Sequence, residues 1–140
     1  APASNPHAGH AGHDMSGLPP VVIPDGALYT EADVRFMQGM IAHHAQAMHM
    51  SKMAESRGAS PRLVRFAQKI DQSQTTEIIQ MQQWLHSKKQ FAPDTSSWRT
   101  MTMAGMLTAG DLAVDVGGLF QRTRESGSGS DGELSGRLRG

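Results

Sequence analysis

The stretch from Glu31 to Arg57, EADVRFMQGMIAHHAQAMHMSKMAESR, decides the fold, because it contains no proline and is followed directly by Gly58. Thr30 and Asp33 resemble a capping box at its start. Glycine is the residue that most often terminates a helix. The pattern therefore predicts one helix over about residues 31–57.

A second helix is predicted to begin almost at once, because Ser60 suits the N-cap and Pro61 suits the first turn. It can run as far as Lys88 and Lys89, whose positive charges suit a helix C-terminus. Two long helices joined by so short a turn must lie antiparallel, so the expected fold is all-α, a helical hairpin. The apolar stripe that we expect on its buried face consists of Leu63, Phe66, Ala67, Ile70, Ile78, Met81 and Leu85.

The composition changes on either side of this helical part. Residues 1–28 are rich in proline and glycine and contain three spaced histidines, which predicts a flexible arm. Residues 114–140 are rich in Gly, Ser and Arg without sustained periodicity, which predicts a disordered tail. We therefore divide the chain into an arm (1–28), a helical metal-binding domain (29–113) and a tail (114–140).

The overall composition excludes several classes of function. The 13 basic and 13 acidic side chains balance and form no basic stripe, so no nucleic-acid partner is expected. No apolar run approaches the ~18 residues of a membrane span. With no cysteine, the only side-chain metal ligands are His, Met and carboxylates. The start Ala-Pro-Ala-Ser-Asn-Pro would suit a mature end after signal-peptide removal, so we expect a periplasmic or secreted protein.

Ten methionines and seven histidines are the unusual feature of the chain, and many of them lie on the first predicted helix. On a helical wheel His43 lies on the flank of that helix with Phe36 and Met50, whereas His49 and Met53 lie on the opposite side. The face centred on His44, which should point to the core, carries Met37, Met40, Ile41, His44, Ala47 and Met48.

Two polar residues interrupt the apolar stripe of the second helix. Gln74 and Glu77 fall on its inward face, and a buried carboxylate without a partner is costly. A histidine of the first helix could satisfy Glu77. Glu77 would then accept the second ring proton of a metal-binding imidazole and fix its tautomer, with Gln74 beside it in this outer shell.

Thioether sulfur combined with neutral imidazole suits copper(I) or silver(I) and rejects magnesium, calcium and manganese. Methionine stripes at helical spacing are, however, more often flexible core filler than ligands, and a single inward histidine is usually a satisfied core residue. The combination of adjacent histidines, flanking methionines and two further sets of the same residues favours a metal site.

Those two sets lie outside the hairpin. His7, His10 and His13, with Met15, could capture copper(II), zinc or nickel, or could belong to a solvated linker or an affinity tag. Met101, Met103 and Met106 could bind metal, or could simply cover an open end of a bundle.

The string DVRFMQGMIAHHAQAMHM from Asp33 to Met50, followed by FAQKIDQSQTTEIIQMQQWL from Phe66 to Leu85, resembles the domain-of-unknown-function family numbered 305 over about residues 31–113. The resemblance implies a ferritin-like four-helix bundle, and members similar to CopM-type periplasmic proteins bind copper and serve copper resistance. By position, the implied metal-binding residues are Met37, Met40, His43, His44 and Met48, with Met81, Met101, Met103 and Met106 as further candidates.

Many family members continue with a second Met/His helix and its partner, which the Gly/Ser/Arg tail replaces here. We expect a truncation or an altered reading frame after about Leu112. A single hairpin would expose an apolar face, so we predict a homodimer in which two hairpins complete the bundle.

Three functions compete on these grounds. Copper sequestration or transfer outside the cytoplasm, without turnover, is the leading hypothesis. A ferritin-like metal oxidase needs inward Glu-x-x-His pairs, and Glu31, Glu55 and Glu77 all lack a histidine three residues on. A metal-free dimerisation or interaction module, in which His43, His44 and Glu77 only form a polar network, is the third.

Overall fold

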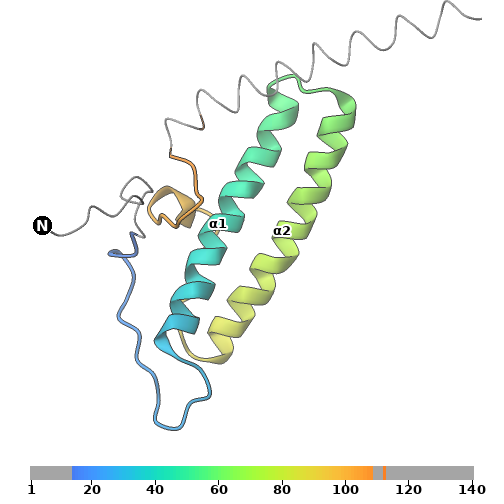
Figure 1. The fold of residues 1–140 in the computed structure, drawn as a ribbon. Coiled ribbons are helices and arrows are strands. Elements are labelled where there is room, and N and C mark those ends of the chain that lie inside the picture. Colours follow the sequence, from blue (N-terminus) through green and yellow to red (C-terminus); the bar gives the residue numbers. More distant parts are fainter. Residues whose placement is uncertain (1–13, 109–111, 113–140) are drawn as a thin grey trace, which may run out of the picture. The chain divides into compact units, whose positions relative to one another are not determined.

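The computed structural model describes residues 14–108 and Leu112. Two helices, α1 (Glu31–Ser56) and α2 (Pro61–Ser87), form a hairpin, and a short 3-10 helix, η1 (Ser97–Arg99), follows them (Figure 1). The all-α hairpin predicted from the sequence is confirmed. The predicted arm residues 1–13 and the whole predicted tail lie outside the described residues. The completion of a four-helix bundle by a second copy stays a prediction.

The capping predicted for α1 is present. Oδ2 of Asp33 accepts hydrogen bonds from the backbone N–H of Thr30 at 2.8 Å and from its hydroxyl at 3.0 Å, and the N–H of Asp33 donates to Oγ1 of Thr30 at 3.3 Å. At the other end Gly58 has φ +71°, and the N–H of Ala59 donates to the carbonyl of Ala54 at 3.0 Å. A positive φ is easy only for glycine, which explains why α1 stops here.

The boundaries of α2 also follow local chemistry. Oγ of Ser60 accepts a hydrogen bond from the N–H of Leu63 at 3.3 Å, as expected for an N-cap. The helix ends at Ser87, slightly earlier than predicted, because Lys89 adopts φ +56° and the N–H of Gln90 donates to the carbonyl of Leu85 at 2.9 Å. A lysine therefore occupies the left-handed position that glycine usually takes.

The described residues divide into two compact units. The first contains the N-terminal part of α1 up to Gln46, the C-terminal part of α2 from Thr75, and the flanking segments up to Met106. The second contains the remainder of both helices around the turn. All the site residues discussed below, except Met48 and Gln74, belong to the first unit.

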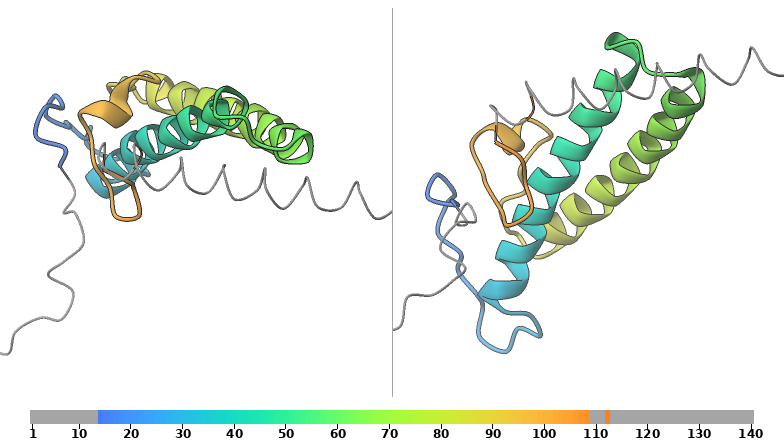
Figure 2. Two further views of the ribbon diagram at one scale, coloured as in Figure 1. Left: turned by 90° about the horizontal axis from the view of Figure 1, so that it is seen from above. Right: turned by 45° about the horizontal axis from the view of Figure 1, so that its top comes forward.

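The core of the first unit surrounds α1 on more than one side. Ile41 and Leu85 are fully buried. Segments before α1 and after α2 are hydrogen-bonded to it, through Arg35 to Pro19 and through Gln38 to Phe91. The segment after α2 includes the methionine loop, residues 101–106, which lies beside α1 on the side away from α2 (Figures 1 and 2). The buried apolar side chains of this unit are Val34, Ile41, Ala42, Ala45, Ile78, Leu85 and Met101.

Side-chain amides hold the flanking segments against the helices. Gln38, only 1% exposed, donates from Nε2 to the carbonyl of Phe91 at 2.9 Å and accepts from Arg35 at 3.1 Å. Gln90 donates to the carbonyl of Val22 at 2.9 Å. Because buried polar atoms are costly without partners, the bond from Gln38 holds the segment after α2 against α1.

The second unit buries less of its predicted stripe. Ala54 and Ala67 are buried, but Phe66, which we expected in the core, is 59% exposed. The stripe from Leu63 to Ile70 covers a wide arc of α2, and a single facing helix covers only part of such an arc. The burial predicted for Phe66 is therefore wrong for one copy of the hairpin.

No helix in the described ranges is both long and apolar enough to cross a membrane.

Candidate metal centre

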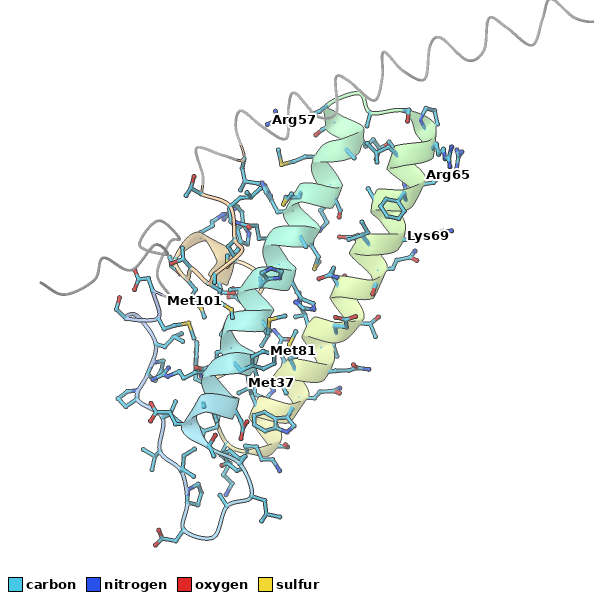
Figure 3. All side chains as sticks on the ribbon, viewed as in Figure 1. Met37, Arg57, Arg65, Lys69, Met81 and Met101 are labelled. Atoms are coloured by element: carbon cyan, nitrogen blue, oxygen red, sulfur yellow. The ribbon has the colours of Figure 1, made fainter. Side chains whose placement is uncertain are left out.

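A groove of about 410 Å³ lies in the first unit, between the two helices. Its walls carry three methionines, one histidine and one carboxylate from the predicted set, and two of these methionines, Met37 and Met81, are labelled in Figure 3. The structure thus brings together Met37 and Met40 of α1 with Met81 of α2. The full lining consists of Phe36, Met37, Met40, His44, Glu77, Gln80, Met81 and Trp84.

His44 is joined to Glu77 across the groove. The distance from Nε2 of His44 to Oε2 of Glu77 is 2.6 Å, so a histidine of the first helix does meet Glu77, as expected, and that histidine is His44. The His44 side chain is 10% exposed, but that of Glu77 is 50% exposed. The expectation of a buried Glu77 is therefore wrong: its side chain reaches His44 from the open rim of the groove.

This hydrogen bond favours one tautomer of a neutral His44 ring. An ionised carboxylate can only accept, so Nε2 must carry the proton that is shared with Glu77. In the neutral ring the lone pair then lies on Nδ1, which is buried and has no hydrogen-bonding atom within reach among the described residues. A buried ring nitrogen with a free lone pair is the donor that a metal ion requires.

His43 does not face this groove. Its ring and that of His44 have centroids 6.0 Å apart and planes at 60° to each other. A methyl group placed on Gly105 would lie 4.0 Å from Nε2 of His43, so this ring faces the methionine loop. The flank position predicted from the helical wheel holds, but its neighbour is a distant part of the chain.

The methionine loop is likewise separate from the groove. Met101 is 4% exposed, and Figure 3 shows it on the other side of α1 from Met37 and Met81. Met103 packs against Gly39, where any side chain would collide with its sulfur. The structure therefore divides the predicted ligands between two faces of α1 and does not gather them in one site.

The remaining predicted residues lie elsewhere. Met48 and Gln74 belong to the second unit, and neither lines the groove. His7, His10 and His13 lie outside the described residues. Met15 is half-buried beside Asp14, which forms an isolated bridge with Thr102.

Sequence reasoning missed two contributors. Trp84 lines the groove, with its ring 5.6 Å from that of Tyr29 at an interplanar angle of 77°. Gly39 admits Met103 to the surface of α1. A glycine inside a helix costs about 1 kcal/mol relative to alanine, so its presence at position 39 was a usable signal of close approach.

The side chains around the groove that could bind a metal ion are of few types. Within residues 14–108 and Leu112, no three side chains of His, Cys, Asp or Glu are grouped so as to hold a metal ion. The groove itself offers a metal ion three thioethers beside one imidazole, and thioethers favour soft ions.

The fold and the groove together define a small all-α hairpin protein with a thioether and imidazole groove between its helices. Residues 33–115 match the family described as Domain of unknown function (DUF305), and the chain belongs to this family.

A curated relative gives a second comparison. An uncharacterised protein of Acanthamoeba polyphaga mimivirus is 36% identical over 72 residues, which cover 49% of this chain and 47% of that protein. The chain thus spans about half the length of this relative. No solved structure matches the chain.

Proposed function

We propose that this protein binds copper outside the cytoplasm and serves copper sequestration, transfer or resistance, as the resemblance to CopM-type proteins suggests. Copper(I) is the cargo of the groove, with Met37, Met40, Met81 and His44 as ligands. Glu77 orients the ring of His44 and is not itself a ligand. No turnover is required of such a protein.

One observation carries the proposal. Nδ1 of His44 is buried without a hydrogen bond from any described residue, while Nε2 is held by Glu77 at 2.6 Å. A structural histidine would normally satisfy both nitrogens, because an unsatisfied buried polar atom costs about 1–3 kcal/mol. A carboxylate on the second nitrogen is the usual outer shell of a metal-binding imidazole.

The ligand types favour one oxidation state and one kind of compartment. Three neutral thioethers and a neutral imidazole stabilise copper(I), whereas copper(II) and zinc prefer additional nitrogen or oxygen ligands. Such ions are therefore better suited to His7, His10 and His13. Methionine and histidine form no disulfides, so a site without cysteine suits an oxidising compartment such as the periplasm.

The test is a titration of the full chain with copper(I) against a chromophoric chelator. Changing Met40 and Met81 together to Leu preserves volume and removes two sulfurs, so the affinity of the groove should fall at least about tenfold. Met53→Leu is the matched control, because Met53 is a half-buried methionine of α1 in the second unit. Equal affinities for the double variant and the control would reject the groove as a copper site.

We also propose that two copies associate as a homodimer. Phe36, Phe66 and Ile79 are 56%, 59% and 48% exposed, which is unusual for large apolar side chains on a helical hairpin. A second hairpin would cover them and complete a four-helix bundle. Light scattering at micromolar concentration should give twice the chain mass of 15.1 kDa, and a monomer would contradict the proposal.

A further inference from the structure

Three cationic side chains follow one edge of α2 in its N-terminal part. Arg62, Arg65 and Lys69 are all exposed, and at about 100° per residue they fall within about 60° of one another. The buried Ala67 lies on the opposite side of the helix. Figure 3 shows Arg65 and Lys69 projecting from α2 on the side away from α1. These three residues, which we call the basic edge, all belong to the second unit.

The charges of the basic edge are not compensated by neighbouring residues. None of the three side chains forms an ion pair with a residue in the ranges 14–108 and Leu112. No acidic residue lies in the first turn of α2, and the first carboxylate along this helix is that of Asp71. The basic edge is therefore accessible to an external anion.

The stability of α2 does not explain this arrangement. The N-terminus of a helix carries a partial positive charge, so a cation in the first turn, such as Arg62, is unfavourable. Like charges three or four residues apart also repel, as Arg62 with Arg65 and Arg65 with Lys69 do. In contrast, α1 has Glu31 and Asp33 in its first turn, where negative charges are favourable. Cations that weaken their own helix are expected where they bind a partner.

The spacing of the basic edge selects the kind of anion. At about 1.5 Å per residue, Arg62 and Lys69 are about 10 Å apart along the helix axis, so the three cations do not converge on a single phosphate group. Phe66, which is 59% exposed, borders the same edge. Cations beside an exposed apolar ring suit a membrane surface, where the charges meet headgroups and the ring enters the boundary with the acyl chains. Three cations are too few for the extended stripe of a nucleic-acid site.

We infer that the basic edge binds the surface of a membrane that contains anionic phospholipids, so that the hairpin is held there as a peripheral protein. The groove residues take no part in this binding, so the inference is independent of the proposed copper function. A second copy that covers Phe66 would still leave Arg65, which points about 100° away from Phe66, outside that contact.

The test is sedimentation of the full chain with phosphatidylcholine vesicles that contain or lack phosphatidylglycerol. We expect binding only where phosphatidylglycerol is present, and weaker binding as the salt concentration rises, because salt screens exposed charges. Changing Arg65 and Lys69 together to Gln should lower the partition coefficient about 10–30-fold, since each basic residue near an anionic surface contributes about a fivefold factor. The same double variant should keep the copper(I) affinity of the unchanged chain.

The matched control changes Lys88 and Lys89 together to Gln. It makes the same change in net charge just after the other end of α2, in the first unit, and should leave the partition coefficient nearly unchanged. Equal losses in the two double variants, or no binding of the unchanged chain to phosphatidylglycerol vesicles, would overturn the inference. Binding to poly-glutamate in place of the vesicles would assign the basic edge to an acidic polypeptide and would equally overturn it.

Thermal unfolding checks that the basic edge does not serve the stability of α2. Because the like charges repel, the double variant of Arg65 and Lys69 should unfold at the same temperature as the unchanged chain or at a slightly higher one. A clearly lower unfolding temperature would show that these cations stabilise the helix, which would contradict the inference.

Discussion

His43 and His44 are neighbours in the chain, yet the structure places them in two different environments. His44 faces α2, is held by a carboxylate at 2.6 Å and lies beside thioethers contributed by the two helices. His43 faces a loop that follows α2, and its neighbouring sulfurs come from Met103 and Met106 of that loop. Adjacent residues on a helix point about 100° apart. Because α1 is covered on two sides, one His-His pair can place a histidine on each of them. The His-His pair is thus one sequence motif that supplies two separate regions.

Among the variants that should affect His44 but not His43, we expect the largest effect from Glu77→Gln. Glutamine keeps the length of the side chain but removes the charge that holds the proton on Nε2 of His44. The affinity of the groove for copper(I) should therefore fall by about 10–100-fold.

Glu55→Gln is the control for this change, because it removes an exposed carboxylate of α1 that lies in the second unit. A similar loss of affinity in both variants would show that net charge, and not the His44 contact, determines binding. The carboxylate contact of His44 would then not explain why its environment differs from that of His43.

A smaller effect is expected from Gly39→Ala, which acts on the other face. The new methyl group collides with the sulfur of Met103, and such overpacking costs about 1–3 kcal/mol. Alanine also stabilises the helix itself by about 1 kcal/mol, which offsets part of this cost. The methionine loop should instead detach, which would raise the hydrogen-exchange rate of the Thr102 amide, bonded to Asp14 at 3.2 Å.

Gly17→Ala gives the matched control, because a Cβ at that position meets nothing within 4 Å. It should leave the Thr102 amide and the copper affinity of the groove unchanged. If Gly39→Ala slows or does not alter exchange at Thr102, the close packing of Met103 does not hold the loop.

The smallest effect concerns the bridge that ties the loop to the segment before α1. Oδ1 of Asp14 accepts hydrogen bonds from the hydroxyl of Ser16 at 2.7 Å and from its N–H at 3.1 Å. These bonds hold the pKa of Asp14 below its ordinary value of 3.8. A carboxyl whose pKa is lower in the folded state stabilises that state above pH 3.8 and loses this contribution as the pH falls through the folded pKa. Ser16→Ala should raise the pKa of Asp14 towards its ordinary value, as an NMR titration would show.

Ser96→Ala is the equivalent change at the second Asp-x-Ser turn. The pKa of Asp94 is lowered in the same way, first by the side chain of Ser96 and then by its backbone. This variant should move only Asp94, whereas Ser16→Ala should also loosen the Thr102 amide slightly. If both variants change the hydrogen-exchange rate of the Thr102 amide equally, the Asp14 turn does not support the hydrogen bonds between Asp14 and Thr102.

Local sequence signals were sufficient for the hairpin. Thr30 with Asp33, Gly58 and Ser60 act through bonds within a few residues, so their consequences could be predicted without knowing the fold. The face of His44 also followed from helical periodicity, and the contact with Glu77 followed from the cost of an unpaired carboxylate.

The environment of His43 could not be predicted in the same way. The methionine loop lies about sixty residues later in the sequence, and its position depends on the Gln38 contact with Phe91 and on the room that Gly39 provides. Such packing depends on contacts between residues distant in sequence, and helical periodicity contains no information about these contacts. The wrong prediction for Phe66 has the same cause. Its apolar side chain predicted burial, but its exposure depends on which other segment packs against it.

Trp84 gives the groove a built-in optical reporter. Its indole lines the same wall as Met81 and lies edge-on to Tyr29, with the Lys88 ammonium 6.0 Å from its ring centre. A heavy cation in the groove would quench this indole by contact, whereas Trp98 stacks with Arg99 and is not part of the groove wall. Occupancy of the groove can therefore be followed through the intrinsic fluorescence of Trp84.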